Sequence, residues 1–194
     1  MTGPLAGPGA VPAPTAGPVA VLIGPMAAGK TSVGRALAAR LGVPFADLDA
    51  LIVQETGRSI PDIFRLEGEQ AFRDREAAAL VRALAHQRGV LSLGGGAPMH
   101  PRAAGTLAQR PVVLLEIDER TAARRLARGV GRPMLEGTDP VARWRELAAS
   151  RAEAYRGLAT HRVDAGRGSP AQVARAIIDA LQLQGPERPE EETE

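Results

Sequence analysis

The sequence predicts an α/β fold in which helices cover both faces of a parallel sheet. Short apolar runs, typical of buried strands, alternate with longer segments that carry apolar residues at helical spacing. A glycine-rich loop at residues 24–31 stands directly between the first apolar run, 19–23, and the first helical segment, 32–41. Ligands of such folds bind outside the carboxyl ends of the strands, so we expect the functional residues in the loops that follow strands.

The composition allows one domain with a core and excludes several functional classes. The chain has 194 residues and no cysteine, which excludes disulfides, a thiol nucleophile and a cysteine zinc site. Its 24 basic residues are scattered among 22 acidic ones, so we expect no nucleic-acid binding. No apolar run approaches the ~18 residues that a membrane span requires, so we expect no membrane partner.

Both ends of the chain differ in composition from the middle. Residues 1–18 carry no charged side chain and are dense in Pro, Gly and Ala, which predicts a disordered extension rather than a signal peptide. Residues 184–194 are rich in glutamate and predict a disordered acidic tail. The folded unit is therefore expected at 19–183.

The elements between these ends follow from apolar runs and capping residues. Strands are predicted at 19–23, 44–49, 90–93, 112–117 and 162–164. Helices are predicted at 32–41, 60–66, 69–88, 119–128 and 140–159. A short helix that ends at Gly57 and a last helix after Ser169 are also predicted. Gly42 is expected to end the helix at 32–41. Ser59 and Ser169 are expected N-caps, each with a proline in the first helical turn. Residues 129–137 are rich in glycine and lack periodicity.

Residues 24–31 (GPMAAGKT) fit the P-loop pattern G-x-x-x-x-G-K-[ST]. In this motif backbone N–H groups bind phosphates, and Gly24 and Gly29 permit a close approach of the backbone. Lys30 would reach the β- and γ-phosphates, and the Thr31 hydroxyl can ligate magnesium. An ordinary turn in an Ala- and Gly-rich chain is the alternative. Against it, Lys30 is the only lysine in a sequence that otherwise uses arginine.

Carboxylates follow two of the predicted strands. Asp47 and Asp49 end the strand at 44–49, and alternation along a strand would place both on one face. Beside a P-loop, such a pair suits a magnesium ligand and an acceptor of a hydroxyl proton, although simple solvation of a strand end is the alternative. Glu116 and Asp118, after the apolar run at 112–115, resemble a Walker B strand and are a rival for the metal role.

Three glycines, Gly94, Gly95 and Gly96, come directly after the strand at 90–93. Consecutive glycines after a buried strand indicate that a ligand approaches the backbone closely, although a flexible turn would have the same composition. Sequence spacing alone does not distinguish Arg73 or Arg151 from solvated surface arginines.

Taken in order, these motifs resemble those of shikimate kinases, over 19–183. The matching stretches are 24–31, 47–49, 57–64 (GRSIPDIF), 68–73 (GEQAFR), 94–96, 132–135 (RPML) and 151–155 (RAEAY). The resemblance implies a three-layer P-loop kinase fold of the nucleoside-monophosphate-kinase type, with a five-stranded parallel sheet and a mobile lid. It also implies ATP-dependent phosphorylation of the shikimate 3-hydroxyl, giving shikimate 3-phosphate and ADP in the pathway to chorismate and aromatic amino acids.

The resemblance further implies a role for each site residue. Asp49 would be the base, with Lys30 and the lid residue Arg132 as the other catalytic groups. Thr31 and Asp47 would hold one Mg²⁺ per subunit. The implied ATP contacts are Ala27, Ala28, Gly29, Lys30, Thr31, Ser32, Arg125, Arg132 and Arg167. The implied shikimate contacts are Asp49, Phe64, Phe72, Arg73, Gly94, Gly95, Gly96 and Arg151.

Two residues depart from the family pattern. Ala27 stands where the family usually has glycine, and Met134 stands where it usually has leucine.

Two other functions are alternatives to a shikimate kinase. A kinase of another small hydroxy acid, such as gluconate, could use the same arginines. A nucleotide-switched binding module without turnover would need neither Asp49 nor the arginine pair. We expect a cytoplasmic monomer whose partners are shikimate and ATP.

The single lysine makes the P-loop assignment testable by chemical labelling. We expect ATP with Mg²⁺ to protect Lys30 from amine reagents, because phosphate oxygens would contact its ammonium group. Peptide mapping with and without nucleotide measures this protection. Labelling of Lys30 that nucleotide does not change would contradict the assignment.

Overall fold

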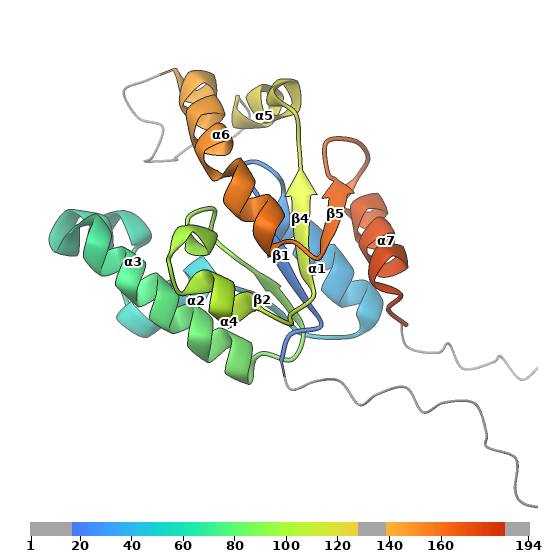
Figure 1. The fold of residues 1–194 in the computed structure, drawn as a ribbon, viewed down its shortest axis with the longest axis horizontal. Coiled ribbons are helices and arrows are strands. Elements are labelled where there is room, and N and C mark those ends of the chain that lie inside the picture. The colour runs from blue at the N-terminus through green and yellow to red at the C-terminus, as the bar shows by residue number, and fades with distance from the viewer. Residues whose placement is uncertain (1–16, 128–138, 185–194) are drawn as a thin grey trace, which may run out of the picture.

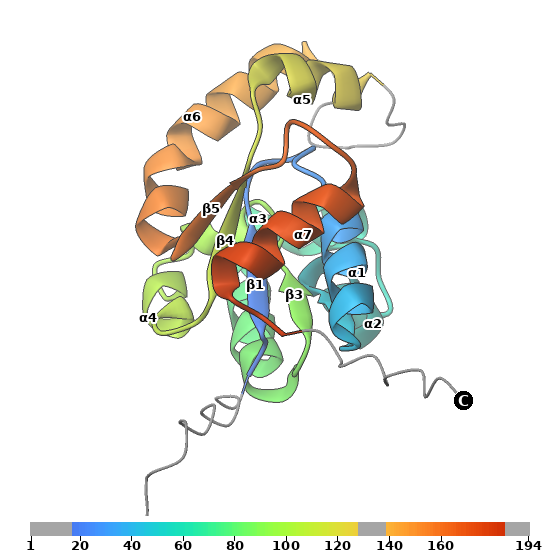
Figure 2. The ribbon, with the colours of Figure 1, turned by 90° about the vertical axis from the view of Figure 1, so that its right-hand side faces the viewer.

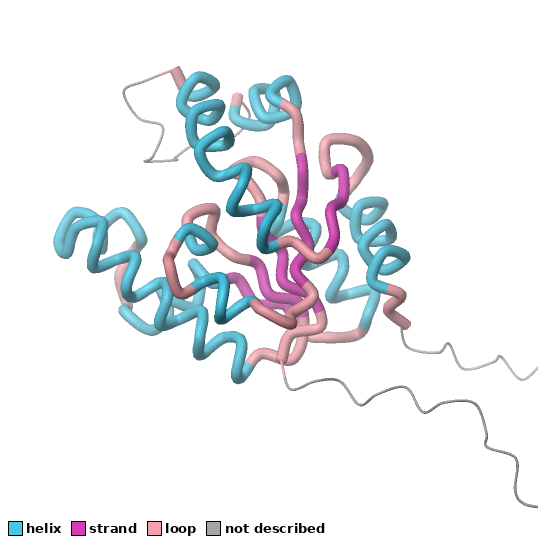
Figure 3. Tube along the Cα trace, viewed as in Figure 1, coloured by secondary structure: helices cyan, strands magenta, loops and turns pink. Residues whose placement is uncertain are grey.

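A computed structural model describes residues 17–127 and 139–184 and confirms the predicted α/β class (Figure 1). Five parallel strands in these residues form one sheet, in the order β2-β3-β1-β4-β5. The strands are β1 (Ala20–Ile23), β2 (Phe45–Asp47), β3 (Val90–Ser92), β4 (Val112–Glu116) and β5 (His161–Asp164). Figure 3 shows them as a central layer between helices. Strands β2 and β3 lie on one side of β1, and β4 and β5 lie on the other. The carboxyl end of β1 is therefore the point where the strand order reverses.

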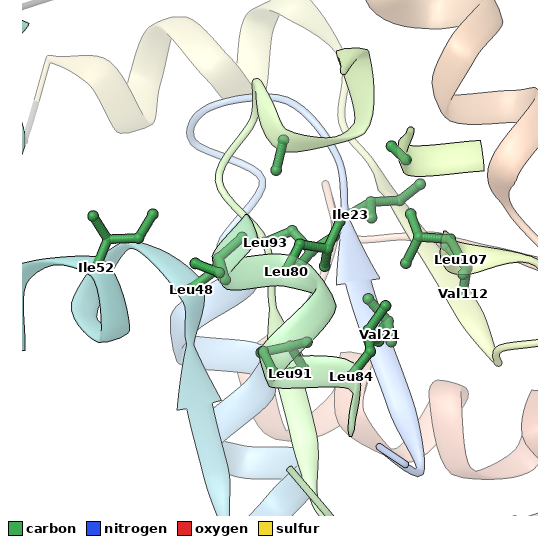
Figure 4. Close-up of a cluster of buried hydrophobic side chains, with 14 of the residues drawn as sticks. Val21, Ile23, Leu48, Ile52, Leu80, Leu84, Leu91, Leu93, Leu107 and Val112 are labelled. Atoms are coloured by element: carbon green, nitrogen blue, oxygen red, sulfur yellow. The ribbon is translucent and has the colours of Figure 1, made fainter. Parts of the chain in front are cut away.

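Helices cover both faces of the sheet, as the sequence predicts. Figure 2 shows α1 (Lys30–Leu41) and α7 (Pro170–Leu181) side by side on one face, with α3 (Ile60–His86) on the far side. The two-residue period of β1 divides its apolar side chains between these layers. Val21 and Ile23 pack with Leu80 and Leu84 of α3 (Figure 4), whereas Leu22 packs with the α1 and α7 side chains.

The remaining helices surround this sandwich. They are α2 (Leu48–Thr56), α4 (Ala103–Leu107), α5 (Glu119–Leu126) and α6 (Pro140–Leu158), with a 3₁₀ turn at Ala97–Met99. Figure 1 shows α5 and α6 beside each other beyond the carboxyl end of β4. The 3₁₀ turn and α4 were not predicted, because each is too short for a periodic pattern. No helix of the described ranges is both long and apolar enough to cross a bilayer.

The predicted caps are confirmed. Ser59 Oγ accepts a hydrogen bond from Asp62 N–H, and Ser169 forms a capping box with Gln172. Gly42 and Gly57 end α1 and α2 in the left-handed conformation, with φ of 65° and 63°. Glycine adopts this conformation at little cost because it has no Cβ.

The prediction that Asp47 and Asp49 share one face of a strand was wrong. The strand ends at Asp47, whose Oδ1 accepts a hydrogen bond of 3.1 Å from Asp49 N–H and so caps α2. Aspartate at this position favours a helix start over another strand residue, and Asp49 therefore lies in the first turn of α2.

The two helices predicted at 60–66 and 69–88 form one element, α3, with a kink. Gly68 stands between them at φ 83° and ψ 171°, outside the helical range. At the N-terminal end of the described chain, Gly17 and Pro18 are buried, although the sequence assigns them to the extension. Predictions for 1–16, for the lid including Arg132 and Met134, and for the tail from residue 185 lie outside the described residues.

Candidate active site

A cavity of about 630 Å³ opens at the carboxyl ends of the strands, where the sequence places the functional residues. Its walls are the P-loop, the starts of α1 and α2, the glycines after β3, and one face each of α3 and α6. The predicted site residues that line it are Ala27, Ala28, Gly29, Lys30, Thr31, Ser32, Asp47, Asp49, Phe64, Phe72, Arg73, Gly94, Gly95, Gly96, Arg125 and Arg151.

The P-loop closes on itself at the end of β1. Lys30 Nζ donates hydrogen bonds to the carbonyl oxygens of Gly24 (2.8 Å) and Pro25 (3.1 Å). A Cβ at Gly24 would lie 2.5 Å from the Leu115 carbonyl oxygen, so the loop backbone packs directly against β4. The N-terminus of α1 follows the left-handed Gly29 and borders the cavity, as an anion site requires.

Two side chains from outside the loop hold its carbonyl groups. The Arg125 guanidinium donates to the oxygens of Ala27 (3.0 Å), Ala28 (3.1 Å) and Ala165 (2.7 Å). The Trp144 indole Nε1–H donates to the Met26 oxygen at 2.9 Å. The family resemblance assigned Arg125 to ATP binding, and the sequence analysis missed Trp144. The only sequence signal for Trp144 is that it is the single tryptophan of the chain.

Thr31, Asp47 and Asp49 form the polar floor between the P-loop and β2. The Thr31 hydroxyl donates to Asp47 Oδ2 at 2.9 Å, which brings together the two side chains expected to bind magnesium. Burial raises the pKa of Asp49, and the nearby Asp47 charge raises it further, while Lys30 and Arg73 oppose the rise. Asp49 lines the same cavity as Lys30 of the P-loop and Arg73 of α3.

Arg73 is held in place by a carboxylate that sequence reasoning missed. Its Nη1 donates to Glu76 Oε2 at 2.8 Å, and the Glu76 side chain is only 3% exposed. The guanidinium also lies over the Phe72 and Phe64 rings, at 5.2 and 5.7 Å from their centroids. Burial raises the pKa of Glu76 even though the Arg73 hydrogen bond lowers it. The i, i+3 spacing on α3 was the signal that could have found this pair.

The three glycines form a backbone wall against which these charged groups pack. A Cβ at Gly94 would lie 2.7 Å from Asp49 Oδ1, and one at Gly96 would lie 2.2 Å from Arg73 Nη1. The Gly95 oxygen accepts hydrogen bonds from the Tyr155 hydroxyl (2.6 Å) and Arg151 Nη1 (3.2 Å). None of the three has a positive φ, so close approach explains the missing side chains at Gly94 and Gly96. A Cβ at Gly95 would meet only ordinary contacts of 3.5 Å with Arg151 and Tyr155.

Some candidates lie outside this arrangement. The Arg167 side chain is 95% exposed and does not line the cavity, although the neighbouring Gly168 and Pro170 do. Glu116 is ion-paired with Arg162, and Asp118 caps α5, and neither lines the cavity. The Walker B alternative therefore has no support. Among the described residues, no group of three or more His, Cys, Asp or Glu side chains is arranged to hold a metal ion.

A closed P-loop at the switch point of a parallel sheet, with a carboxylate and two arginines beside it, defines a P-loop kinase with a small acceptor pocket. Comparison with known proteins then identifies which kinase family this is. The family model for shikimate kinase matches residues 26–182. The chain belongs to the shikimate kinase family.

Individual relatives agree with this result. A shikimate kinase from Mycobacterium tuberculosis (strain ATCC 25177 / H37Ra) is 47% identical over 169 residues, which are 87% of this chain and 96% of the relative. The structure of a shikimate kinase from Acinetobacter baumannii in complex with shikimate has a TM-score of 0.81 at 36% identity and covers 87% of this chain and 94% of that one. A gluconokinase from Sinorhizobium meliloti 1021, with a TM-score of 0.57 at 23% identity over 86% of this chain and 93% of that one, shares the fold alone.

The contact between Gly96 and Arg73 generates a prediction. Gly96→Ala would place a methyl group 2.2 Å from the present position of Arg73 Nη1 and push the guanidinium away from Glu76. We expect the KM for shikimate to rise about tenfold, the equivalent of one charge-assisted hydrogen bond, with little change in the KM for ATP. Steady-state kinetics measure both constants.

The matched control is Gly105→Ala, because a Cβ at Gly105 meets no atom within 4 Å. This variant should leave both KM values unchanged. If Gly96→Ala behaves like Gly105→Ala, the wall does not position Arg73.

Proposed function

We infer that this chain transfers the γ-phosphoryl group of ATP to the 3-hydroxyl of shikimate, releasing ADP and shikimate 3-phosphate. The observation that carries this inference is the position of Asp49, which lines one cavity together with Lys30 of the P-loop and Arg73. One carboxylate thus lies at the junction of the phosphate side and the acceptor side. Family membership identifies the acceptor as shikimate.

On the phosphate side, we assign phosphate binding to the P-loop backbone and Lys30. The Lys30 ammonium already contacts two loop carbonyl oxygens, so its reach is limited to the space that the loop surrounds. We assign Mg²⁺ to Thr31 and Asp47, because two neighbouring side-chain oxygens suit an ion that keeps several of its waters. When bound, the ion would offset the negative charge of the phosphates.

The nucleotide base has a candidate position at the far side of the P-loop. Arg125, Ala165, Gly168 and Pro170 line that part of the cavity. We propose adenine contacts for Arg125, whereas the exposed side chain of Arg167 supports no more than contact at the rim.

A monomeric state and a cytoplasmic location are also part of the proposal, on family resemblance. Size-exclusion chromatography with light scattering tests the monomeric state.

On the acceptor side, we assign the shikimate carboxylate to Arg73 and Arg151. Both guanidinium groups lie against the glycine wall, Arg73 at Gly96 and Arg151 at Gly95. Asp49 contacts the wall at Gly94, and we assign it to the reacting hydroxyl, from which it would accept the proton as phosphoryl transfer proceeds. The enzyme forms no covalent bond itself, so positioning and charge stabilisation lower the barrier.

A coupled assay of ADP release with ATP and either shikimate or gluconate tests the function. We expect release that depends on shikimate and not on gluconate. Gluconate-dependent release would favour the alternative acid, and nucleotide binding without acceptor-dependent release would favour a nucleotide-switched module.

The role of Asp49 predicts a specific pH dependence. The base acts in its ionised form, so kcat/KM should fall as pH falls through the pKa of Asp49, which lies above the ordinary aspartate value. Asp49→Asn should lower kcat by about 10²–10⁴-fold and remove this acid limb, because an amide cannot accept the proton. Rate–pH profiles of both proteins measure the change.

The control for this variant is Asp179→Asn, which alters an exposed carboxylate on α7. It should keep the wild-type profile. Near-normal turnover of Asp49→Asn would mean that the base lies elsewhere or that none is needed.

The assignment of the shikimate carboxylate to Arg73 and Arg151 also predicts a selective kinetic defect. An arginine matches a carboxylate with two parallel hydrogen bonds, which lysine cannot reproduce. Arg73→Lys should lower kcat/KM for shikimate by about 10–100-fold while the KM for ATP changes much less. Shikimate methyl ester should be a poor substrate of the wild type, and the Arg73→Lys penalty should shrink with it.

Arg162→Lys is the matched control, because Arg162 pairs with Glu116 away from the cavity. Equal damage to the ATP and shikimate kinetics of Arg73→Lys, or equal use of ester and acid, would show that other groups hold the acceptor.

A further inference from the structure

One face of α6 runs along the cavity from its phosphate side to its acceptor side. The residues of α6 that line the cavity are Trp144, Leu147, Ala148, Arg151 and Tyr155. Their three- and four-residue spacing places them on a single helix face. Trp144 and Tyr155 are about three turns apart on this face, or roughly 16 Å along the axis. Figure 2 shows α6 reaching from α5 down to the start of β5.

At the phosphate end, Trp144 holds the P-loop from outside. Its side chain is buried with Ala122 and Leu126 of α5 and packs against Met26 and Ala27. Its indole N–H donates to the Met26 oxygen, one residue before Ala27. Ala27 has a left-handed φ of 65°, which costs a residue with a Cβ about 1–2 kcal/mol. The Trp144 hydrogen bond therefore supports the loop next to its strained residue.

At the acceptor end, Tyr155 holds the glycine wall in the same manner. Its buried hydroxyl donates to the Gly95 oxygen at 2.6 Å, the same atom that Arg151 contacts at 3.2 Å. Arg151 is assigned to the shikimate carboxylate, so its contact with Gly95 can be exchanged for substrate. The neutral phenol of Tyr155 has no such alternative assignment and remains the fixed donor to the wall.

We propose that α6 sets the spacing between the ATP loop and the shikimate wall, with Trp144 and Tyr155 as its two positioning residues. The proposal rests on the proposed function of the same site. It assigns the Trp144 end of α6 to ATP binding and the Tyr155 end to shikimate binding. Phosphoryl transfer needs the reacting atoms about 3–3.5 Å apart, so two walls tied to one rigid helix keep donor and acceptor in register. Trp144 acts through Met26, and Tyr155 acts through Gly95.

Two variants that each remove one donor and keep an aromatic ring test the two ends. Trp144→Phe should raise the KM for ATP and the dissociation constant for ADP about 3- to 10-fold, and leave the KM for shikimate within about twofold. Tyr155→Phe should raise the KM and the dissociation constant for shikimate about 3- to 10-fold, and leave the KM for ATP within about twofold. Calorimetric titration with ADP and with shikimate, beside steady-state kinetics, measures the four constants.

The double variant tests the spacing itself. With one tie lost, the other still anchors one wall to α6, so each single variant should change kcat little. With both ties lost, kcat should fall by more than the product of the two single effects. Strictly multiplicative effects on kcat would overturn the claim that α6 sets the spacing.

Controls separate positioning from folding. Ser150→Ala lies on the exposed side of α6, where the hydroxyl bonds only within the helix, and should match the wild type in all constants. If either aromatic variant shifts both KM values alike, or lowers only the melting temperature, α6 is a packing support and the proposal fails. The ADP titration of Trp144→Phe does not depend on the acceptor, so it still decides the phosphate end if no shikimate-dependent ADP release is found.

Discussion

The closed P-loop is the constraint from which the other functional groups take their positions. Lys30 reaches back to the Gly24 and Pro25 carbonyl oxygens, and the backbone at Gly24 lies so close to β4 that no Cβ fits there. The loop is thereby seated on the carboxyl edge of the sheet. Asp47 reaches it from β2 through the Thr31 hydroxyl. The neighbouring strands then deliver their own groups to the same edge, because all five run in parallel.

Buried charge is the second feature that shapes the site. Glu76 is almost fully buried, and a buried carboxylate is costly unless it is paired. Its partner Arg73 is thereby oriented before any substrate binds, which reduces the ordering that a carboxylate ligand would have to impose. Burial also raises the pKa values of Glu76 and Asp49, so the surroundings that orient Arg73 also favour a raised pKa in the proposed base.

Local signals in the sequence were sufficient for much of the fold and part of the site. The P-loop pattern, the apolar strands and the caps at Ser59 and Ser169 depend on neighbours within a few residues, so the sequence shows them directly. The interpretation failed where two local preferences competed. At Asp47 the capping of α2 prevailed over continuation of the strand, and Asp49 moved from a strand to a helix. Arg73 and Arg151 were assigned by family resemblance, because nothing in their spacing distinguishes them from surface arginines.

The sequence by itself therefore determined the α/β class, the phosphate loop and the edge of the sheet where the chemistry takes place. Only the tertiary structure decided which side chains from distant segments share that edge. Glu76 became important because the fold buries it beside Arg73. Trp144 and Tyr155 became important because α6 packs across the cavity and brings their donors to the Met26 and Gly95 oxygens, 118 and 60 residues away in the chain. Contacts at such separations leave no periodic or local signal, since they depend on how whole elements pack.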